Sequence, residues 1–257
     1  MATVAAAAVG AAPADAVGAR RCHSGAMADL RDRSVIVVGA TGGLGAPIAS
    51  LLAAQGARLT LVARSEERLA AVGVQGVPVA VDIRKAASAA RIVEAAEAAY
   101  GGVDGVVFAA GVVAFGSIAD TPDDVMIDLF TTNTLAPLRL MRAALPALRG
   151  SAEQKRDPFV VNVSAVVAEQ PMPGMAAYSA SKAALMAYDA AAARELRREG
   201  IRVIDVRPPH TETGLATRPV HGEAPRLPQG LAPQAVAERV VLAITDDEKD
   251  LASGDFG

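Results

Sequence analysis

The chain has 257 residues, a formal net charge of −3 and a single cysteine, Cys22. This length fits one α/β domain, and a hydrophobic content of 52% allows a large core. No basic patch interleaved with aromatic residues points to nucleic acid, and no apolar run approaches the ~18 residues of a membrane-spanning helix. A lone cysteine excludes an internal disulfide and is consistent with a reducing compartment. We therefore expect a cytoplasmic protein without a nucleic-acid or membrane partner.

Residues 1–28 differ in composition from the rest of the chain and are rich in alanine and glycine. Arg20 and Arg21 follow the alanines, whereas a secretory signal begins with its basic residues. We expect a disordered tail here and a folded domain at 29–257. Alternatively, translation begins at Met27. Mass spectrometry of the native N-terminus tests this, and a peptide spanning Thr3 to Arg20 would contradict a start at Met27.

Short β-branched runs, typical of buried parallel strands, are predicted to alternate with helices from Ser34 onward. The helix at 122–148 is expected to be interrupted or kinked near Pro137 and Pro146. The alternation predicts an α/β fold with a doubly wound parallel sheet in one domain. The predicted strands are 34–38, 59–63, 77–81, 103–109, 159–163 and 201–206, and the predicted helices are 46–55, 65–71, 85–100, 122–148 and 178–199.

A glycine-rich loop follows the first predicted strand. Its spacing is Gly-x-x-x-Gly-x-Gly, and a helix is predicted directly after it. Glycines allow a backbone to approach a pyrophosphate closely, and the helix N-terminus offers N–H donors, although glycines also serve plain turns. The position between strand and helix favours a nucleotide-binding loop, formed by Gly39, Thr41, Gly42, Gly43, Leu44 and Gly45.

The end of the second strand bears on the choice of nucleotide. An acidic residue there would hold the ribose hydroxyls of NAD and repel a 2′-phosphate. This chain has Ala63 and then Arg64, and arginine binds phosphate through charge-assisted hydrogen bonds. The nearby Glu66 and Glu67 could instead neutralise an arginine in solvent. We predict NADP(H) as the preferred cofactor, with NAD(H) as the alternative.

Tyr178 and Lys182 stand four residues apart, which places them on one face of a helix, one turn apart. The unperturbed pKa of tyrosine is about 10, and a neighbouring ammonium lowers it. Such a pair can transfer a proton to or from a carbonyl or alcohol. The pattern alone also fits an ordinary helix, so its weight comes from the glycine loop in the same chain.

With the loop and the pair together, residues from about Ser34 to Thr213 resemble the short-chain dehydrogenase/reductase family. The resemblance implies a Rossmann-type fold and a catalytic set of Ser164, Tyr178, Lys182 and Asn133. In that set Tyr178 transfers the proton, and Lys182 lowers its pKa and holds the nicotinamide ribose. Ser164 binds the substrate oxygen, and Asn133 holds a water connected to Lys182. The resemblance also implies cofactor contacts at Asp82, Ala110, Gly111, Tyr178, Lys182, Pro208, Thr211 and Thr213.

The chain departs from the family pattern at several positions. Phe108 and Ala109 replace two asparagines of a turn, so a bond that steadies the central strands is expected to be lost. Pro209 replaces a glycine and stiffens the segment after the last predicted strand. Residues 246–257 lack the glycine-rich final strand segment of the family, which favours a homodimer over a tetramer.

The motifs predict an oxidoreductase that moves a hydride between NADP(H) and a small or medium-sized carbonyl or secondary alcohol. Residues 214–230 are expected to form the substrate lid. A non-catalytic NADP-binding regulator of the same fold is the alternative, and the chain is too short for the substrate domain of a sugar-nucleotide epimerase. His210 and His221 lack partners at metal-ligand spacing, so no metal site is predicted.

Overall fold

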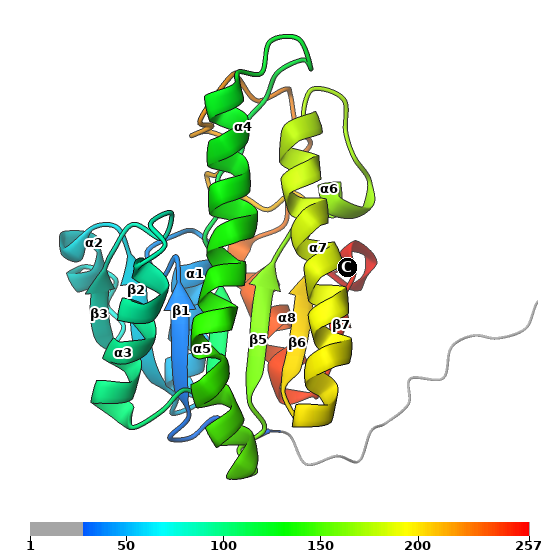
Figure 1. The fold of residues 1–257 in the computed structure, drawn as a ribbon. Helices are drawn as coiled ribbons and strands as arrows, with labels where there is room; N and C mark the ends of the chain where they lie inside the picture. The colour runs from blue at the N-terminus through cyan, green and yellow to red at the C-terminus, as the bar shows by residue number, and fades with distance from the viewer. Residues whose placement is uncertain (1–27, 257) are drawn as a thin grey trace, which may run out of the picture.

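The structure is a computed structural model that describes residues 28–256. Its centre is a seven-stranded parallel sheet of order β3-β2-β1-β4-β5-β6-β7, which confirms the predicted Rossmann-type fold (Figure 1). The tail predicted at 1–28 lies, except for Ala28, outside the described residues. The strands are β1 (Ser34–Val38), β2 (Arg58–Ala63), β3 (Val77–Ala80), β4 (Gly105–Phe108), β5 (Phe159–Val163), β6 (Arg202–Val206) and β7 (Asp250–Leu251).

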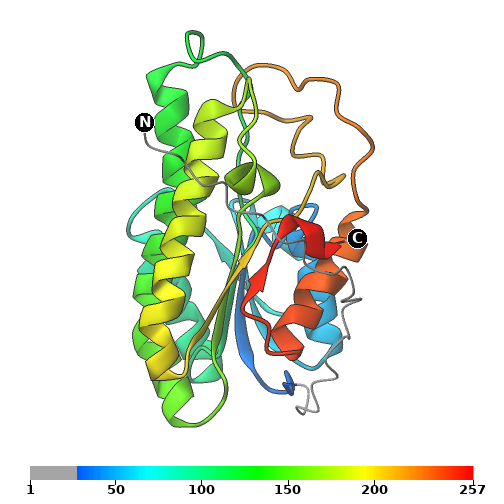
Figure 2. The ribbon, with the colours of Figure 1, turned by 90° about the vertical axis from the view of Figure 1, so that its right-hand side faces the viewer.

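Helices cover both faces of the sheet, so the central strands are buried on both sides (Figure 2). In β1, Val35 and Val37 face α1 (Gly45–Ala54) and α8 (Pro233–Thr245). Ile36 and Val38 face the opposite layer, which contains α3 (Ser88–Tyr100), α5 (Ala136–Glu153) and α7 (Ala176–Leu196). Burial on both faces explains why these strands are continuously apolar rather than alternating.

The predicted helix at 122–148 is interrupted once. It divides into α4 (Asp123–Phe130), a π-helical segment (Thr131–Leu135) and α5. The break lies just before Pro137, which sits in the first turn of α5 where its missing N–H is not needed. The predicted interruption near Pro146 does not occur, since α5 continues through it to Glu153. The π-helical segment carries Asn133 into the site described below.

Several elements were not predicted. The prediction missed α8, although Pro233 at its start and the buried Val236 and Val240 were visible signals. Strand β7 has two residues and pairs with β6 in parallel, so a strand does form in the segment expected to lack one. The other missed elements are α6 (Val166–Glu169) and a 3₁₀ helix, Ser253–Phe256, while the end of the helix predicted at 178–199 forms a 3₁₀ helix, Arg197–Glu199. The short helix near Ser65 forms as α2 (Glu66–Ala70).

The fold brings the loops that follow β1, β4, β5 and β6 together at the carboxyl ends of the strands (Figures 1 and 2). The order in which successive strands are added to the parallel sheet changes direction between β1 and β4, a position where nucleotides bind in open α/β sheets. Over residues 28–256, none of the helices is long and apolar enough to cross a membrane.

Candidate functional site

The glycine loop passes very close to the turn that follows β4. Gly39 has φ +83°, and a Cβ there would lie 2.9 Å from the backbone nitrogen of Ala110. A Cβ on Gly45 would lie 2.1 Å from the carbonyl oxygen of Gly39. The start of α1 can therefore lie this close to the end of β1 only because Gly45 has no side chain. These contacts explain the glycines structurally, and they bring Ala110 beside the loop as expected.

The loop also touches the segment after β6. A Cβ on Gly43 would lie 2.6 Å from the carbonyl oxygen of Thr213. The hydroxyl of Thr211 donates to the Pro209 carbonyl at 2.9 Å, and the buried Pro208 accepts from the Val166 backbone N–H at 3.1 Å. The segment predicted to contact the cofactor therefore lies against the glycine loop.

Two arginines lie near the end of β2. Arg64 is exposed, and among residues 28–256 its side chain makes no hydrogen bond. Arg68 was not predicted as a site residue, but its guanidinium donates to the Thr41 carbonyl in the glycine loop at 2.9 Å. The Ser65 hydroxyl accepts from the Arg68 backbone N–H at 3.2 Å and caps α2. Arg68 therefore connects α2 to the glycine loop.

Asp82, expected to contact the cofactor, lies just after β3 with its carboxylate held by Arg84. The two side chains form an ion pair at 2.8 Å, and the Arg84 backbone N–H donates to Asp82 at 3.0 Å. The side-chain bond from Arg84 holds the pKa of Asp82 below its usual value. Arg84 also pairs with Asp128 of α4 at 3.1 Å, so this corner of the site is tied to α4.

Tyr178 and Lys182 lie in the first half of α7, and both side chains are buried. The Lys182 ammonium donates to the carbonyl of Val163, next to Ser164, at 2.8 Å. Burial lowers the pKa of Lys182 to about 8. Burial also raises the pKa of Tyr178, so the lowering expected from the lysine is not present here. Desolvation causes this rise, and the Lys182 ammonium is directed at a backbone carbonyl.

Ser164 follows β5 and is buried. Its hydroxyl donates to Oδ1 of Asp205 at 2.6 Å, and its backbone N–H donates to the Val206 carbonyl at 2.8 Å. Asp205 was not predicted as a site residue. It lies in β6 between two apolar neighbours, and no motif in the sequence distinguishes it from an acid on the surface.

Asn133 uses its side-chain amide to hold the loop after β4. Its Oδ1 accepts from the Val112 N–H and its Nδ2 donates to the Val112 carbonyl, both at 2.9 Å. The same Nδ2 donates to the Ser181 hydroxyl at 3.0 Å. A Cβ on Gly111 would lie 3.2 Å from the Asn133 Oδ1 and 3.4 Å from the Lys182 Nζ. Asn133 and Lys182 therefore both lie beside Gly111.

Apolar residues surround Tyr178. Leu215 and Ala216, from the segment predicted as the lid, pack against this group. The lid segment is also held by backbone hydrogen bonds, from Val220 to Val113 at 2.8 Å and from Phe115 to His221 at 2.9 Å. We call the group the apolar cluster; its buried members besides Tyr178 are Val113, Ala114, Phe115, Val125, Leu129, Val167 and Met175.

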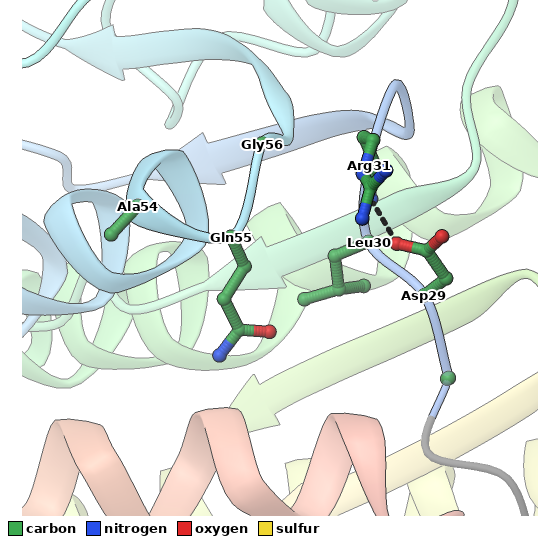
Figure 3. A pocket seen from close by; sticks show the side chains of 7 residues that line it. Asp29, Leu30, Arg31, Ala54, Gln55 and Gly56 are labelled. Carbon is green, nitrogen blue, oxygen red and sulfur yellow. Dashed lines mark hydrogen bonds between the residues drawn. The ribbon is translucent and has the colours of Figure 1, made fainter.

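A cavity of about 470 Å³ lies far from these residues, where β1 begins and α1 ends (Figure 3). Leu30, Gln55 and Gly56 line it together with Asp29, whose carboxylate accepts from the Arg31 backbone N–H at 2.9 Å. It contains none of the predicted site residues. Residues 28–256 also contain no group of three or more His, Cys, Asp or Glu side chains arranged to hold a metal ion.

Comparison with known proteins agrees with this geometry. Residues 33–223 match the family model described as short chain dehydrogenase. A short chain dehydrogenase of Pseudocercospora fijiensis is 34% identical over 195 residues, covering 72% of this chain and 62% of that protein. Ipsdienol dehydrogenase of Ips pini is 32% identical over 203 residues, covering 76% of this chain and 80% of that protein.

A solved structure gives the same result. A short chain dehydrogenase from Burkholderia cenocepacia, in complex with NADP, is 27% identical and superimposes with a TM-score of 0.74 over 87% of this chain and 90% of that one. The family model covers more than half of the sequence and includes the glycine loop, Asn133, Ser164, Tyr178 and Lys182. This protein is therefore an oxidoreductase that belongs to the short-chain dehydrogenase/reductase family.

Proposed function

We propose that this protein transfers a hydride between NADP(H) and a small or medium-sized carbonyl or secondary alcohol. The observation that supports the proposal is the bond from Lys182, one helical turn from Tyr178, to the Val163 carbonyl next to Ser164, beside the turn after β4 that touches the glycine loop. Burial keeps Tyr178 in its protonated form, which is the form that donates a proton to a carbonyl oxygen. A non-catalytic regulator would not require this arrangement.

The residues of the loop fit a dinucleotide. A Cβ at Gly39, Gly43 or Gly45 would collide with neighbouring backbone, so this loop presents main chain rather than side chains at the N-terminus of α1. Gly39, Thr41, Gly42, Gly43, Leu44 and Gly45 would hold the pyrophosphate, and Asp82, Ala110, Gly111, Pro208, Thr211 and Thr213 would line the rest of the cofactor site. The nicotinamide would supply the hydride.

The protein's own groups handle the proton. Tyr178 donates it to the substrate oxygen in reduction and accepts it in oxidation. Lys182 supports the charge change on Tyr178 and holds the nicotinamide ribose, while Asn133 fixes the neighbouring loop through Val112. Because the cluster around Tyr178 is apolar, a substrate without charge near its reacting carbon fits best. Residues 214–230 would act as the lid over this substrate.

The finer assignments rest on particular residues. The exposed Arg64 after β2, with no acid at position 63, supports NADP(H) over NAD(H). Exposed apolar side chains on α4 and the π-helical segment, at Ile127, Phe130 and Leu135, support assembly as a homodimer. The single Cys22 supports a location in the cytoplasm.

A screen tests the proposal. We would measure nicotinamide absorbance with NADPH or NADP⁺ and three pairs: 2-octanone with 2-octanol, acetophenone with 1-phenylethanol, and cyclohexanone with cyclohexanol. We expect turnover with at least one pair. Tyr178→Phe should reduce kcat by roughly 10²-fold or more while NADPH affinity is kept. Tyr188→Phe, on the same helix but outside the site, is the control. Cofactor binding without turnover of any pair would favour the regulator.

A further inference from the structure

Three segments that contribute to the apolar cluster are joined to one another through their backbones. They are the loop after β4, the connection between α6 and α7, and the lid segment, and all three lie above the carboxyl ends of the strands (Figures 1 and 2). The Gly116 N–H donates to the Gly174 carbonyl at 2.8 Å, and the Phe115 N–H donates to the His221 carbonyl at 2.9 Å. A Cβ on Gly222 would lie 1.9 Å from the Phe115 carbonyl oxygen, so the lid segment lies directly against the loop.

Each of these segments also carries a large apolar side chain in solvent, close in sequence to one of the bonds that join them. Ile118 in the loop after β4 is 87% exposed, Met172 between α6 and α7 is 45% exposed, and Val220 in the lid segment is 40% exposed. The Val220 N–H itself donates to the carbonyl of Val113, a member of the apolar cluster, at 2.8 Å. A single exposed apolar residue is ordinary, but three on segments that are bonded together point to a binding surface. We call these three residues the apolar rim.

The apolar rim continues the apolar cluster outward to solvent. Tyr178 is only 6% exposed and is packed within the cluster, so a substrate oxygen that reaches its hydroxyl is surrounded by apolar side chains. Phe115 and Met175 are buried members of the cluster, and they lie in the same segments as Ile118 and Met172 respectively. Along both segments the chain therefore passes from a buried apolar residue beside the reaction site to an exposed apolar residue at its edge.

We propose that the apolar rim binds an alkyl or alkenyl chain of the substrate, so that the protein prefers a ketone or secondary alcohol with a long unbranched apolar group on one side of its reacting carbon. Such a chain would extend from the cluster over the rim and remove apolar surface from water on both partners. A charged group in the same place would lose hydration without gaining a partner from these residues. The inference rests on the proposed function and adds a substrate class to it.

A series of substrates that differ only in chain length tests this inference. We would measure kcat/KM for 2-butanone, 2-hexanone, 2-octanone and 2-decanone with NADPH, and for the matching 2-alkanols with NADP⁺. We expect kcat/KM to rise roughly two- to threefold for each added methylene, somewhat less than for complete burial because the rim stays partly in solvent. Calorimetric titration of 2-decanone into the protein with NADP⁺ measures binding without turnover, because this form of the nicotinamide has no hydride to give.

Polar substitutions at the apolar rim provide the second arm of the test. In the combined variant Ile118→Ser, Met172→Ser and Val220→Ser, we expect the ratio of kcat/KM for 2-decanone to that for 2-butanone to fall roughly three- to tenfold. The affinity for 2-decanone in the calorimetric titration should fall by a similar factor. Leu242→Ser, on α8, is the matched control, because this side chain is 44% exposed and lies outside the rim. Its ratio should equal that of the wild type.

The failures of the two proposals are distinguishable. Turnover in the wild type without a rise along the series, turnover of the ring-containing pairs alone, or an unchanged ratio in the combined variant overturns the role of the rim and leaves the proposed function standing. A lower molecular mass of the combined variant in light scattering, with its ratio unchanged, would instead make the rim a contact between two copies of this chain. Absence of turnover with every pair of the screen and every member of the series overturns the proposed function, and the role of the rim falls with it.

Discussion

Lys182 reaches from α7 to the end of β5, where its ammonium donates to the Val163 carbonyl at 2.8 Å. This bond connects the helix that carries Tyr178 to the strand that ends beside Ser164. It also explains how a lysine that is 4% exposed keeps a polar partner. The position of Tyr178 and Lys182 relative to Ser164 is therefore set by a side-chain bond to backbone as well as by helix spacing.

Lys182→Met should separate catalysis from folding. We expect kcat to fall roughly 10²-fold or more, because no cation remains beside Tyr178. Thermal stability should change little, since removing a desolvated ammonium offsets the loss of a donor to Val163. Activity and the thermal midpoint are measured together, with Lys155→Met, in the turn after α5, as the control. A parallel loss of both would assign Lys182 a purely structural role.

Local spacing made part of the candidate site readable from the sequence. Tyr178 and Lys182 lie on one helix, and Gly39, Gly43 and Gly45 lie on one loop, so both patterns were readable without tertiary information. The parallel, doubly wound sheet followed from the alternation of strands and helices. Asn133 reaches the site through a π-helical segment that no propensity signalled, and its place there came from family resemblance alone.

The residues that were missed act through long-range contacts. Asp205 meets Ser164 across 41 positions of sequence, and Arg68 meets Thr41 across 27. Neither pair has a recurring spacing, because each depends on how two strands lie side by side or how a helix packs over a loop. Long-range contacts also explain why the pKa of Tyr178 is raised rather than lowered. The burial of Tyr178 depends on the apolar cluster, whose members come from separate segments of the chain.

Gly43→Ala should disturb the cofactor loop and the segment after β6 together. The new Cβ would lie 2.6 Å from the Thr213 carbonyl oxygen and 2.7 Å from its Cα, so backbone must move. We expect a loss of about 1–3 kcal/mol in unfolding free energy and weaker binding of both NADPH and NADH. Gly102→Ala, where a Cβ meets nothing within 4 Å, is the control for a loop glycine. Unchanged nucleotide affinity in Gly43→Ala would contradict the loop assignment.

Arg64 and Arg68 should differ in how they affect the two nucleotides. Arg64→Ala should weaken NADPH binding by one to two decades, because a charge-assisted bond contributes ~1.5–3 kcal/mol. The affinity for NADH should stay almost unchanged. Arg68→Ala removes the bond to the Thr41 carbonyl and should weaken both nucleotides by a similar, smaller factor. Titrating both nucleotides against the three proteins is the measurement. Equal weakening of NADPH and NADH in Arg64→Ala would argue against NADP(H) preference.

Asp189 lies on α7, seven residues after Lys182, and is buried against β5. Its Oδ1 accepts from the Asn162 amide at 2.7 Å, and its Oδ2 has no hydrogen-bond partner among residues 28–256. Burial raises the pKa of Asp189 to about 8 from an ordinary value of 3.8. Between these two pH values the folded state keeps a proton that the unfolded chain has lost, so stability must fall as the pH rises through this window.

Asp189→Asn should abolish that pH dependence. The amide keeps the size of the carboxyl group and carries no charge at any pH, so the variant avoids burying an ionised group at high pH. We expect its unfolding free energy to exceed that of the wild type by roughly 1–3 kcal/mol at pH 8.5, with the difference shrinking toward pH 5. Denaturant unfolding at both pH values measures this, and Asp246→Asn, at an exposed position after α8, controls for the loss of one negative charge. A difference that is the same at pH 5 and pH 8.5 would mean that Asp189 does not titrate with a raised pKa in the folded protein.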